Sequence, residues 1–274
     1  SFIKNNIMKN KRILYVSSEL VPYMPPSRRA DVSLEIPRLM QEAGSEVRIF
    51  MPRHGNINER RHQLHDVIRL SGMNLVVNDI DQPLIIKVAS VPRERLQVYF
   101  IDNEEYFRGH EREKAQGGVF RDSDERGIFF AKGVLETVKK LNWSPDIVHV
   151  NGPLCFMLPL YIKTLYKDDP AFSDTRVVAS IFGEGFSGSL GEHLCEKLSF
   201  DHIEEPLLAD PTYENLTKTC LKYSDAVVVD SPERAKWAEE MAKNRKLPSL
   251  IDPEQQPAGY DQYAALYAEI LNEE

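Results

Sequence analysis

Cysteine is scarce in this chain of 274 residues, which contains three. They stand far apart, at Cys155, Cys195 and Cys220, and no two form a C-x-x-C pair. An odd and widely spaced set does not make a disulfide framework, and it lacks the spacing of a structural zinc site. We therefore expect reduced thiols, no bound metal and a cytoplasmic protein.

Long apolar runs and an excess of basic residues are also missing. The longest apolar candidate, residues 156–162, contains a proline and is too short to cross a bilayer. The first residues include lysines but no apolar segment of the kind that secretory signals carry. Acidic residues outnumber basic ones, 42 to 34, and the net charge of −8 argues against a nucleic acid partner. We predict neither a membrane span nor nucleic acid binding.

Alternating strand and helix patterns dominate what the chain does contain. Residues 12–19 and 45–53 are apolar runs rich in β-preferring residues, and a helical pattern over residues 30–44 separates them. This order is a βαβ unit, which implies parallel strands. Similar alternation returns after residue 123. We predict an α/β fold, with a Rossmann-like, mainly parallel sheet and helices on both of its faces.

Some segments depart from this alternation. Residues 73–102 combine strand patterns with Asn, Asp and Pro turns, so a hairpin excursion is expected, and residues 103–123 have the composition of a loop. We predict one domain over residues 12–240, preceded by an extension over residues 1–11 that is in part a cloning remnant. Residues 241–274 are expected to form a proline-bearing connector and a helix that packs on the same domain.

Two short motifs have a functional and a structural interpretation. The stretch Ile181–Gly188, IFGEGFSG, spells G-x-G-x-x-G, but it comes late in the chain, whereas a dinucleotide fingerprint follows the first strand. We interpret it as a loop at the carboxyl edge of the sheet and expect no nucleotide cofactor. His62 and His65 have H-x-x-H spacing without a third ligand nearby, so we interpret them as part of a solvated helix face.

His149 lies near the end of the predicted strand over residues 146–150. The carboxyl ends of parallel strands form the edge where open α/β sheets bind ligands, which gives this side chain a possible ligand role. A buried histidine bonded to the backbone is an equally good interpretation, and the sequence does not separate the two.

An ordered set of segments resembles the amino-terminal domain of bacterial glycogen synthases and plant starch synthases. It begins with RILYVSSELVPY and RADVSLEIPRLMQEAGSEVRIFMPRHG, continues through VYFIDNEEYF and DERGIFFAKGVLETV, and ends with WSPDIVHV, LPLYIKTLY and SDAVVVDSPERA. The resemblance covers residues 12–240 and implies the amino-terminal half of a GT-B glycosyltransferase. The family transfers glucose, with retention, from ADP-glucose or UDP-glucose during glycogen or starch synthesis.

The sequence departs from the family pattern where that pattern carries chemistry. A Lys-x-Gly-Gly loop after the first strand brings amides and a cation to the phosphates of the sugar nucleotide, and it reads Pro25–Arg28 here. A His-x-His-Asp-Trp-His segment keeps only its first histidine, His149, while Asn151 and Leu154 replace the other two. In a Thr-Ile-His-Asn segment, Phe182 replaces the histidine.

We therefore assign no catalytic residue and predict an altered ligand groove. The favoured hypothesis is a synthase-like pseudoenzyme without autonomous glucosyltransferase activity, which binds an α-glucan or a nucleotide sugar or regulates a protein partner. One alternative is an active ADP-glucose or UDP-glucose glucosyltransferase whose second domain is supplied in trans, by another chain or by a homo-oligomer. Another is a protein-interaction module. The candidate groove residues are Tyr23, Arg28, Asp31, His149, Asn151, Phe182, Gly183 and Glu184.

Overall fold

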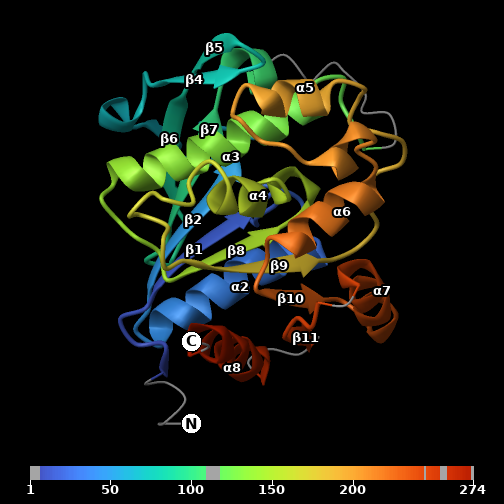
Figure 1. The fold of residues 1–274 in the computed structure, drawn as a ribbon. Coiled ribbons are helices and arrows are strands. Elements are labelled where there is room, and N and C mark those ends of the chain that lie inside the picture. Colours follow the sequence, from blue (N-terminus) through green and yellow to red (C-terminus); the bar gives the residue numbers. More distant parts are fainter. Residues whose placement is uncertain (1–6, 109–117, 244, 254–257, 273–274) are drawn as a thin grey trace.

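The strands form a nine-stranded sheet in the order β11-β10-β9-β8-β1-β2-β7-β6-β3 (Figure 1). This computed structural model describes residues 7–108, 118–243, 245–253 and 258–272. From β11 to β7 neighbouring strands run parallel, whereas β6 is antiparallel to β7 and β3 is antiparallel to β6. The predicted α/β class and mainly parallel sheet are confirmed. The strands are β1 (Arg12–Ser17), β2 (Glu46–Pro52), β3 (His65–Asp66), β6 (Ile85–Ser90), β7 (Gln97–Asp102), β8 (Ile147–Asn151), β9 (Arg176–Ile181), β10 (Ala226–Val229) and β11 (Ser249–Ile251).

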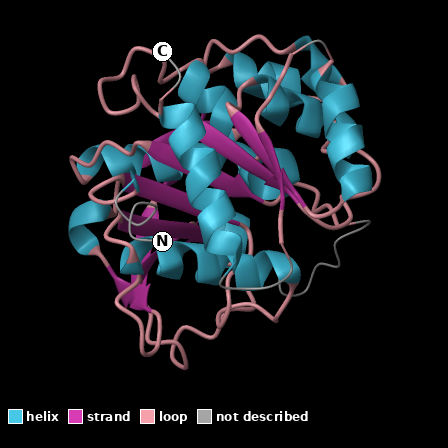
Figure 2. Ribbon diagram, turned by 90° about the horizontal axis from the view of Figure 1, so that it is seen from below, coloured by secondary structure: helices cyan, strands magenta, loops and turns pink. Residues whose placement is uncertain are grey.

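Helices cover both faces of this sheet, as predicted (Figure 2). One apolar cluster joins α2 and α8 to one face, and a larger cluster joins α3, α4, α6 and α7 to the other. The central strands are buried on both sides, as expected for parallel strands between two helical layers; every residue of β8, for example, is buried. The helices are α2 (Arg28–Glu42), α3 (Ser123–Lys140), α4 (Leu158–Lys163), α5 (Leu194–Ser199), α6 (Tyr213–Lys222), α7 (Pro232–Ala242) and α8 (Ala258–Leu271), with single turns η1 (Ile68–Leu70), η2 (Glu104–Arg108), η4 (Pro153–Cys155) and η5 (Pro206–Ala209).

The predicted hairpin excursion consists of two hairpins. β6 and β7 pair within the main sheet, and β4 (Asn74–Val77) pairs with β5 (Ile80–Pro83) as a separate two-stranded sheet. Asn78 and Asp79 connect β4 to β5 with φ of 51° and 60°, the left-handed backbone that Asn and Asp tolerate in tight hairpin turns.

One local prediction was wrong, and another segment contains a strand that the sequence did not indicate. The H-x-x-H stretch is not helical, because His62 lies in a turn and His65 begins the short strand β3. The predicted connector after α7 contains β11, which pairs parallel to β10 at the sheet edge. Parts of three predicted segments, residues 1–6, 109–117 and 254–257, lie outside the described residues.

The register brings the carboxyl ends of the central strands to one edge. Ser17 of β1 pairs with Asn151 of β8, which pairs with Ser180 of β9. Val229 of β10 lies between Ile181 and Ile251 in the same way. The loops after these strands therefore meet beside the amino-terminal end of α2, and that is where the candidate site is built.

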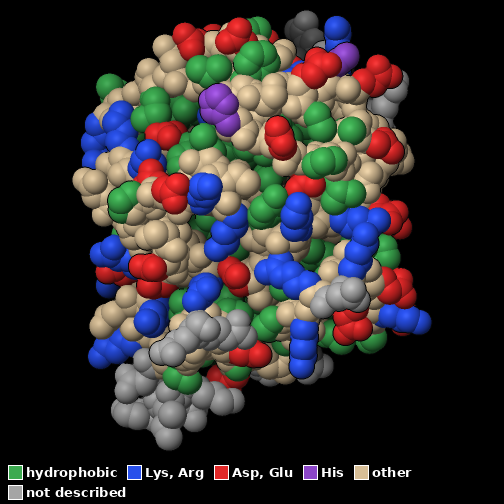
Figure 3. All heavy atoms as spheres, viewed as in Figure 1, with side chains coloured by type: hydrophobic (Ala, Val, Ile, Leu, Met, Phe, Trp, Pro, Cys, Tyr) green, Lys and Arg blue, Asp and Glu red, His purple; other side chains and the backbone are tan. Residues whose placement is uncertain are grey.

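The surface carries both signs of charge. On the face shown in Figure 3, Lys and Arg side chains are interspersed with Asp and Glu. None of the helices within the described ranges is long and apolar enough to cross a membrane.

Candidate functional site

The amino-terminal end of α2 carries two consecutive arginines toward the sheet edge. Ser27 caps this helix, since its hydroxyl accepts a hydrogen bond from the Ala30 amide at 3.0 Å. The same hydroxyl donates to Glu19 at 2.9 Å, which ties the helix start to the loop after β1. A capped helix start with two cations is a favourable place for an anion.

Arg28 is held by a carboxylate of the chain itself. Its guanidinium lies 3.0 Å from the Asp252 carboxylate, just after β11, and donates to the backbone carbonyls of Asp252 and Asp230 at 2.8 and 3.0 Å. It also lies over the Phe182 ring, 5.5 Å from its centroid. Tyr263 of α8 donates to the other Asp252 oxygen at 2.8 Å. The Arg28 guanidinium is thus already paired with a carboxylate and two carbonyls of the chain.

Arg29 is also paired with other groups of the chain. Its Nε donates to the side-chain oxygen of Asn151 at 3.1 Å, and its Nη2 donates to the carbonyl of Phe182 at 2.6 Å. Glu19 is a third partner, 3.8 Å away. Asn151 is fully buried and also donates to the Tyr15 hydroxyl at 3.3 Å. These contacts fill the space between the ends of β1, β8 and β9.

His149 is a buried core residue, and its ring bonds to side-chain hydroxyls and not to the backbone. Its Nδ1 lies 2.5 Å from the hydroxyl of Tyr267 in α8, and its Nε2 lies 2.6 Å from the hydroxyl of Ser180. Burial lowers the pKa of His149 to about 3, so the imidazole is neutral at neutral pH. Its ring packs against Tyr15, with centroids 4.7 Å apart, and no part of His149 is exposed.

The other candidate residues do not form one groove. Tyr23 packs edge-on against Phe100 of β7 and against His62, and its buried hydroxyl has no hydrogen-bond partner among the described residues. Asp31, in the first turn of α2, and Glu184, in the loop after β9, are exposed. Arg28, Asn151 and Phe182 are therefore brought together, whereas Tyr23 lies apart from them.

The G-x-G-x-x-G stretch is a loop, and backbone conformation and packing explain why glycine stands at two of its positions. Gly183 has φ of 68° and donates its amide to Asp230 at 2.6 Å. A Cβ at Gly185 would lie 2.2 Å from the Tyr213 ring, so only glycine fits there. The loop does not open a helix, since the next helix, α5, begins at Leu194. It therefore lacks the helix start on which a dinucleotide pyrophosphate would rest.

Several residues of this site were missed in the sequence. Asp252 and Asp230 follow β11 and β10, and the prolines around β11 concealed the strand that positions Asp252. Tyr263 and Tyr267 lie four residues apart on α8, and this spacing on one helix face is the signal that could have identified them.

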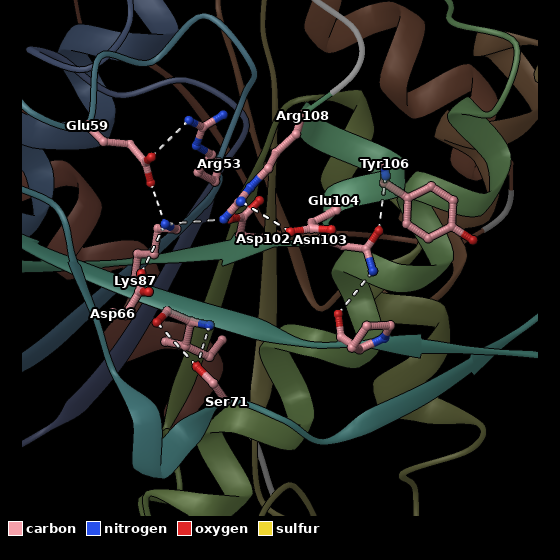
Figure 4. A network of polar contacts seen from close by, with 12 residues as sticks. Arg53, Glu59, Asp66, Ser71, Lys87, Asp102, Asn103, Glu104, Tyr106 and Arg108 are labelled. Atoms are coloured by element: carbon pink, nitrogen blue, oxygen red, sulfur yellow. Dashed lines mark hydrogen bonds and ion pairs between the residues drawn. The ribbon is translucent and has the colours of Figure 1, made fainter.

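A second polar cluster lies at the ends of β2, β6 and β7 (Figure 4). Lys87 lies 2.6 Å from Glu59 and 3.0 Å from Asp66, and Arg53 also pairs with Glu59. The Asp102 carboxyl is fully buried, and its burial raises its pKa although Arg108 lies 3.2 Å away. The pair of Arg108 and Asp102 ties η2 to the end of β7, and Lys87 and Arg53 are both paired with Glu59.

An open hollow of about 690 Å³ remains beside α2. It is lined by the charged residues Arg28, Asp31, Glu35 and Asp252 and by the apolar residues Val21, Val32, Leu34 and Pro253. Within the described part of the chain, no three His, Cys, Asp or Glu side chains are grouped to hold a metal ion. The hollow is the part of the predicted groove that Arg28 and Asp31 actually share.

Comparisons with known proteins identify the family. Residues 12–247 match the family model of the starch synthase catalytic domain. The glycogen synthases of Chlorobium limicola and Chlorobaculum tepidum are both 35% identical, over 81% and 83% of this chain. The chain spans about half of their length, 46% and 47%.

A solved structure agrees with this assignment at the level of the fold. The catalytic domain of Starch Synthase IV from Arabidopsis thaliana, bound to ADP and acarbose, superposes with a TM-score of 0.69 at 15% identity. The match covers 91% of this chain and 54% of that one. The structure shows the shared fold, and the family model over residues 12–247 shows that the chain belongs to the starch synthase catalytic domain family.

Proposed function

We propose that residues 1–274 form a synthase-like cytoplasmic domain that does not transfer glucose by itself and acts by binding a glucan or by regulating a partner. The observation that carries this proposal is that Arg28 forms an ion pair and a hydrogen bond with Asp252. A sugar-nucleotide diphosphate needs cations and free amides, and here an internal carboxylate takes the cation. Arg29, bonded to Asn151 and to the Phe182 carbonyl, does not replace it.

The hollow beside α2 favours a glucan over a nucleotide sugar. Asp31 brings an exposed carboxylate to it, the Glu35 carboxylate lies beside it paired with Arg38, and Val21 and Pro253 supply apolar surface. Carboxylates accept hydrogen bonds from sugar hydroxyls but repel a diphosphate, and apolar side chains pack against the C–H faces of glucose rings. A neutral, hydroxyl-rich chain fits these requirements.

We expect no glucose transfer by the purified protein. Incubation with ADP-glucose or UDP-glucose labelled with carbon-14, in the presence of glycogen, should leave the glycogen fraction at the level of a heat-killed control. The assay should be run at low and high protein concentration, because a homo-oligomer could complete the site. Incorporation above the control at either concentration would refute the proposal and favour the active-transferase alternative.

Calorimetry should show binding of maltoheptaose, and no binding of ADP or ADP-glucose. Asp31→Ala should weaken maltoheptaose binding by about tenfold or more, the effect of losing about one hydrogen bond to a charged acceptor. Asp81→Ala is the matched control, since Asp81 is an exposed carboxylate on β5 and does not line the hollow. If none of the ligands gives a heat of binding, the proposal of glucan binding is refuted and the protein-interaction alternative is favoured.

A further inference from the structure

A second cavity, separate from the hollow beside α2, lies between α3, η4 and the loop after β9. Its volume is about 150 Å³. α3 and α4 lie side by side here, with α6 beside them (Figure 1). Its walls are Val119, Phe120, Pro153, Leu154, Met157, Phe186, Leu190 and Leu216, with Gly118, Gly127 and the polar residues His54, Ser123 and Arg126.

The polar side chains of this cavity are engaged with the protein. Arg126 donates from Nε to the Tyr106 carbonyl at 2.7 Å, lies 3.4 Å from Asp122 and stacks over the Phe120 ring at 4.3 Å. The Ser123 hydroxyl accepts a hydrogen bond from the Phe120 amide at 2.8 Å. These groups hold the wall in shape and have their main hydrogen bonds satisfied within it.

His54 completes the polar wall as a neutral group. Its Nε2 lies 2.7 Å from the Ser18 carbonyl, so Nε2 carries the proton and donates to that oxygen. Burial lowers the pKa of His54, and the ring therefore stays uncharged at neutral pH. The wall presents neither a set of converging donors nor an unpaired charge to a guest.

We propose that this cavity binds a small uncharged apolar ring, of the size of benzene or cyclohexane. The Leu, Met and Phe side chains in the wall of this cavity offer dispersion contacts to an apolar guest. A glucose ring would bury hydroxyl groups without partners, and each of them would cost free energy. The ligand class therefore differs from that of the hollow beside α2, and the two proposals stand independently.

Benzene is the direct probe. About 10 mM benzene should raise the Tm of the protein by about 3 °C, which corresponds to a millimolar Kd, whereas the same concentration of glucose should leave it unchanged. Leu154→Trp places a larger side chain at the cavity wall and should abolish the benzene shift. Leu165→Trp is the matched control, because Leu165 is exposed and lies outside the cavity.

A crystal of the unmodified protein soaked in bromobenzene keeps the test decisive if the tryptophan variant does not fold. The bromine anomalous peak should lie among Leu154, Met157 and Leu216. A peak elsewhere, no benzene shift in the unmodified protein, or equal shifts in the Leu154→Trp and Leu165→Trp variants would overturn the proposal.

Discussion

Acidification from pH 7 to pH 4 should lower the free energy of unfolding of this protein by about 3 kcal/mol more than that of a His149→Gln variant. Burial holds the pKa of His149 at about 3 in the folded state, against an ordinary value of 6.5. Below pH 6.5, His149 binds a proton in the unfolded chain but stays neutral in the folded chain. The stabilisation is thus complete above the unfolded pKa and is lost as the pH falls toward 3, at about 1.4 kcal/mol per pH unit.

Urea unfolding at several pH values would measure this effect. Glutamine is a suitable replacement because its amide can still bond the hydroxyls of Tyr267 and Ser180, which lie on either side of the imidazole. His65→Gln serves as the control, since His65 is exposed in β3, and it should follow the pH profile of the unmodified protein. Parallel profiles for the unmodified protein and the His149→Gln variant would show that His149 is not buried in the neutral form.

The fold followed from local patterns, whereas the site depended on distant contacts. Short apolar runs around a helical pattern predict a βαβ unit wherever they occur, so β1, α2 and β2 could be expected from residues 12–53. The position of His149 within β8 was also predictable. Its environment was not, because Tyr267 lies 118 residues further along the chain.

The environment of Asp252 was even harder to predict from the sequence. β11 has three residues and lies among prolines, so neither length nor periodicity marks it as a strand. The hydrogen bond between Arg28 and Asp252 joins positions 224 residues apart. The absence of the Lys-x-Gly-Gly pattern could be seen in the sequence, but the ion pair between Arg28 and Asp252 could not.

Replacement of Arg28 by methionine should cost about 3 kcal/mol of unfolding free energy at pH 7. The Asp252 carboxylate is almost completely buried, with 1% of its side chain exposed, and without Arg28 its charge would be left without an ionic partner. Arg38→Met, on the same helix, should cost less than about 1 kcal/mol, because Arg38 and its partners Glu35 and Glu42 are all in part exposed, at 26%, 28% and 60% of their side chains. Urea unfolding of both variants measures the difference.

A double-mutant cycle with Asp252→Asn isolates the ion pair from other effects of the helix start. Asparagine can still accept the hydrogen bond from Tyr263 but carries no charge, so Asp252→Asn should recover much of the stability that Arg28→Met loses. Burial already raises the pKa of Asp252, and removal of Arg28 should raise it further. Protonation then relieves the buried charge, and the cost of Arg28→Met should be smaller at pH 4.5 than at pH 7. A cost that is equal at both pH values, or additive losses in the double variant, would mean that Asp252 does not hold Arg28 through its charge.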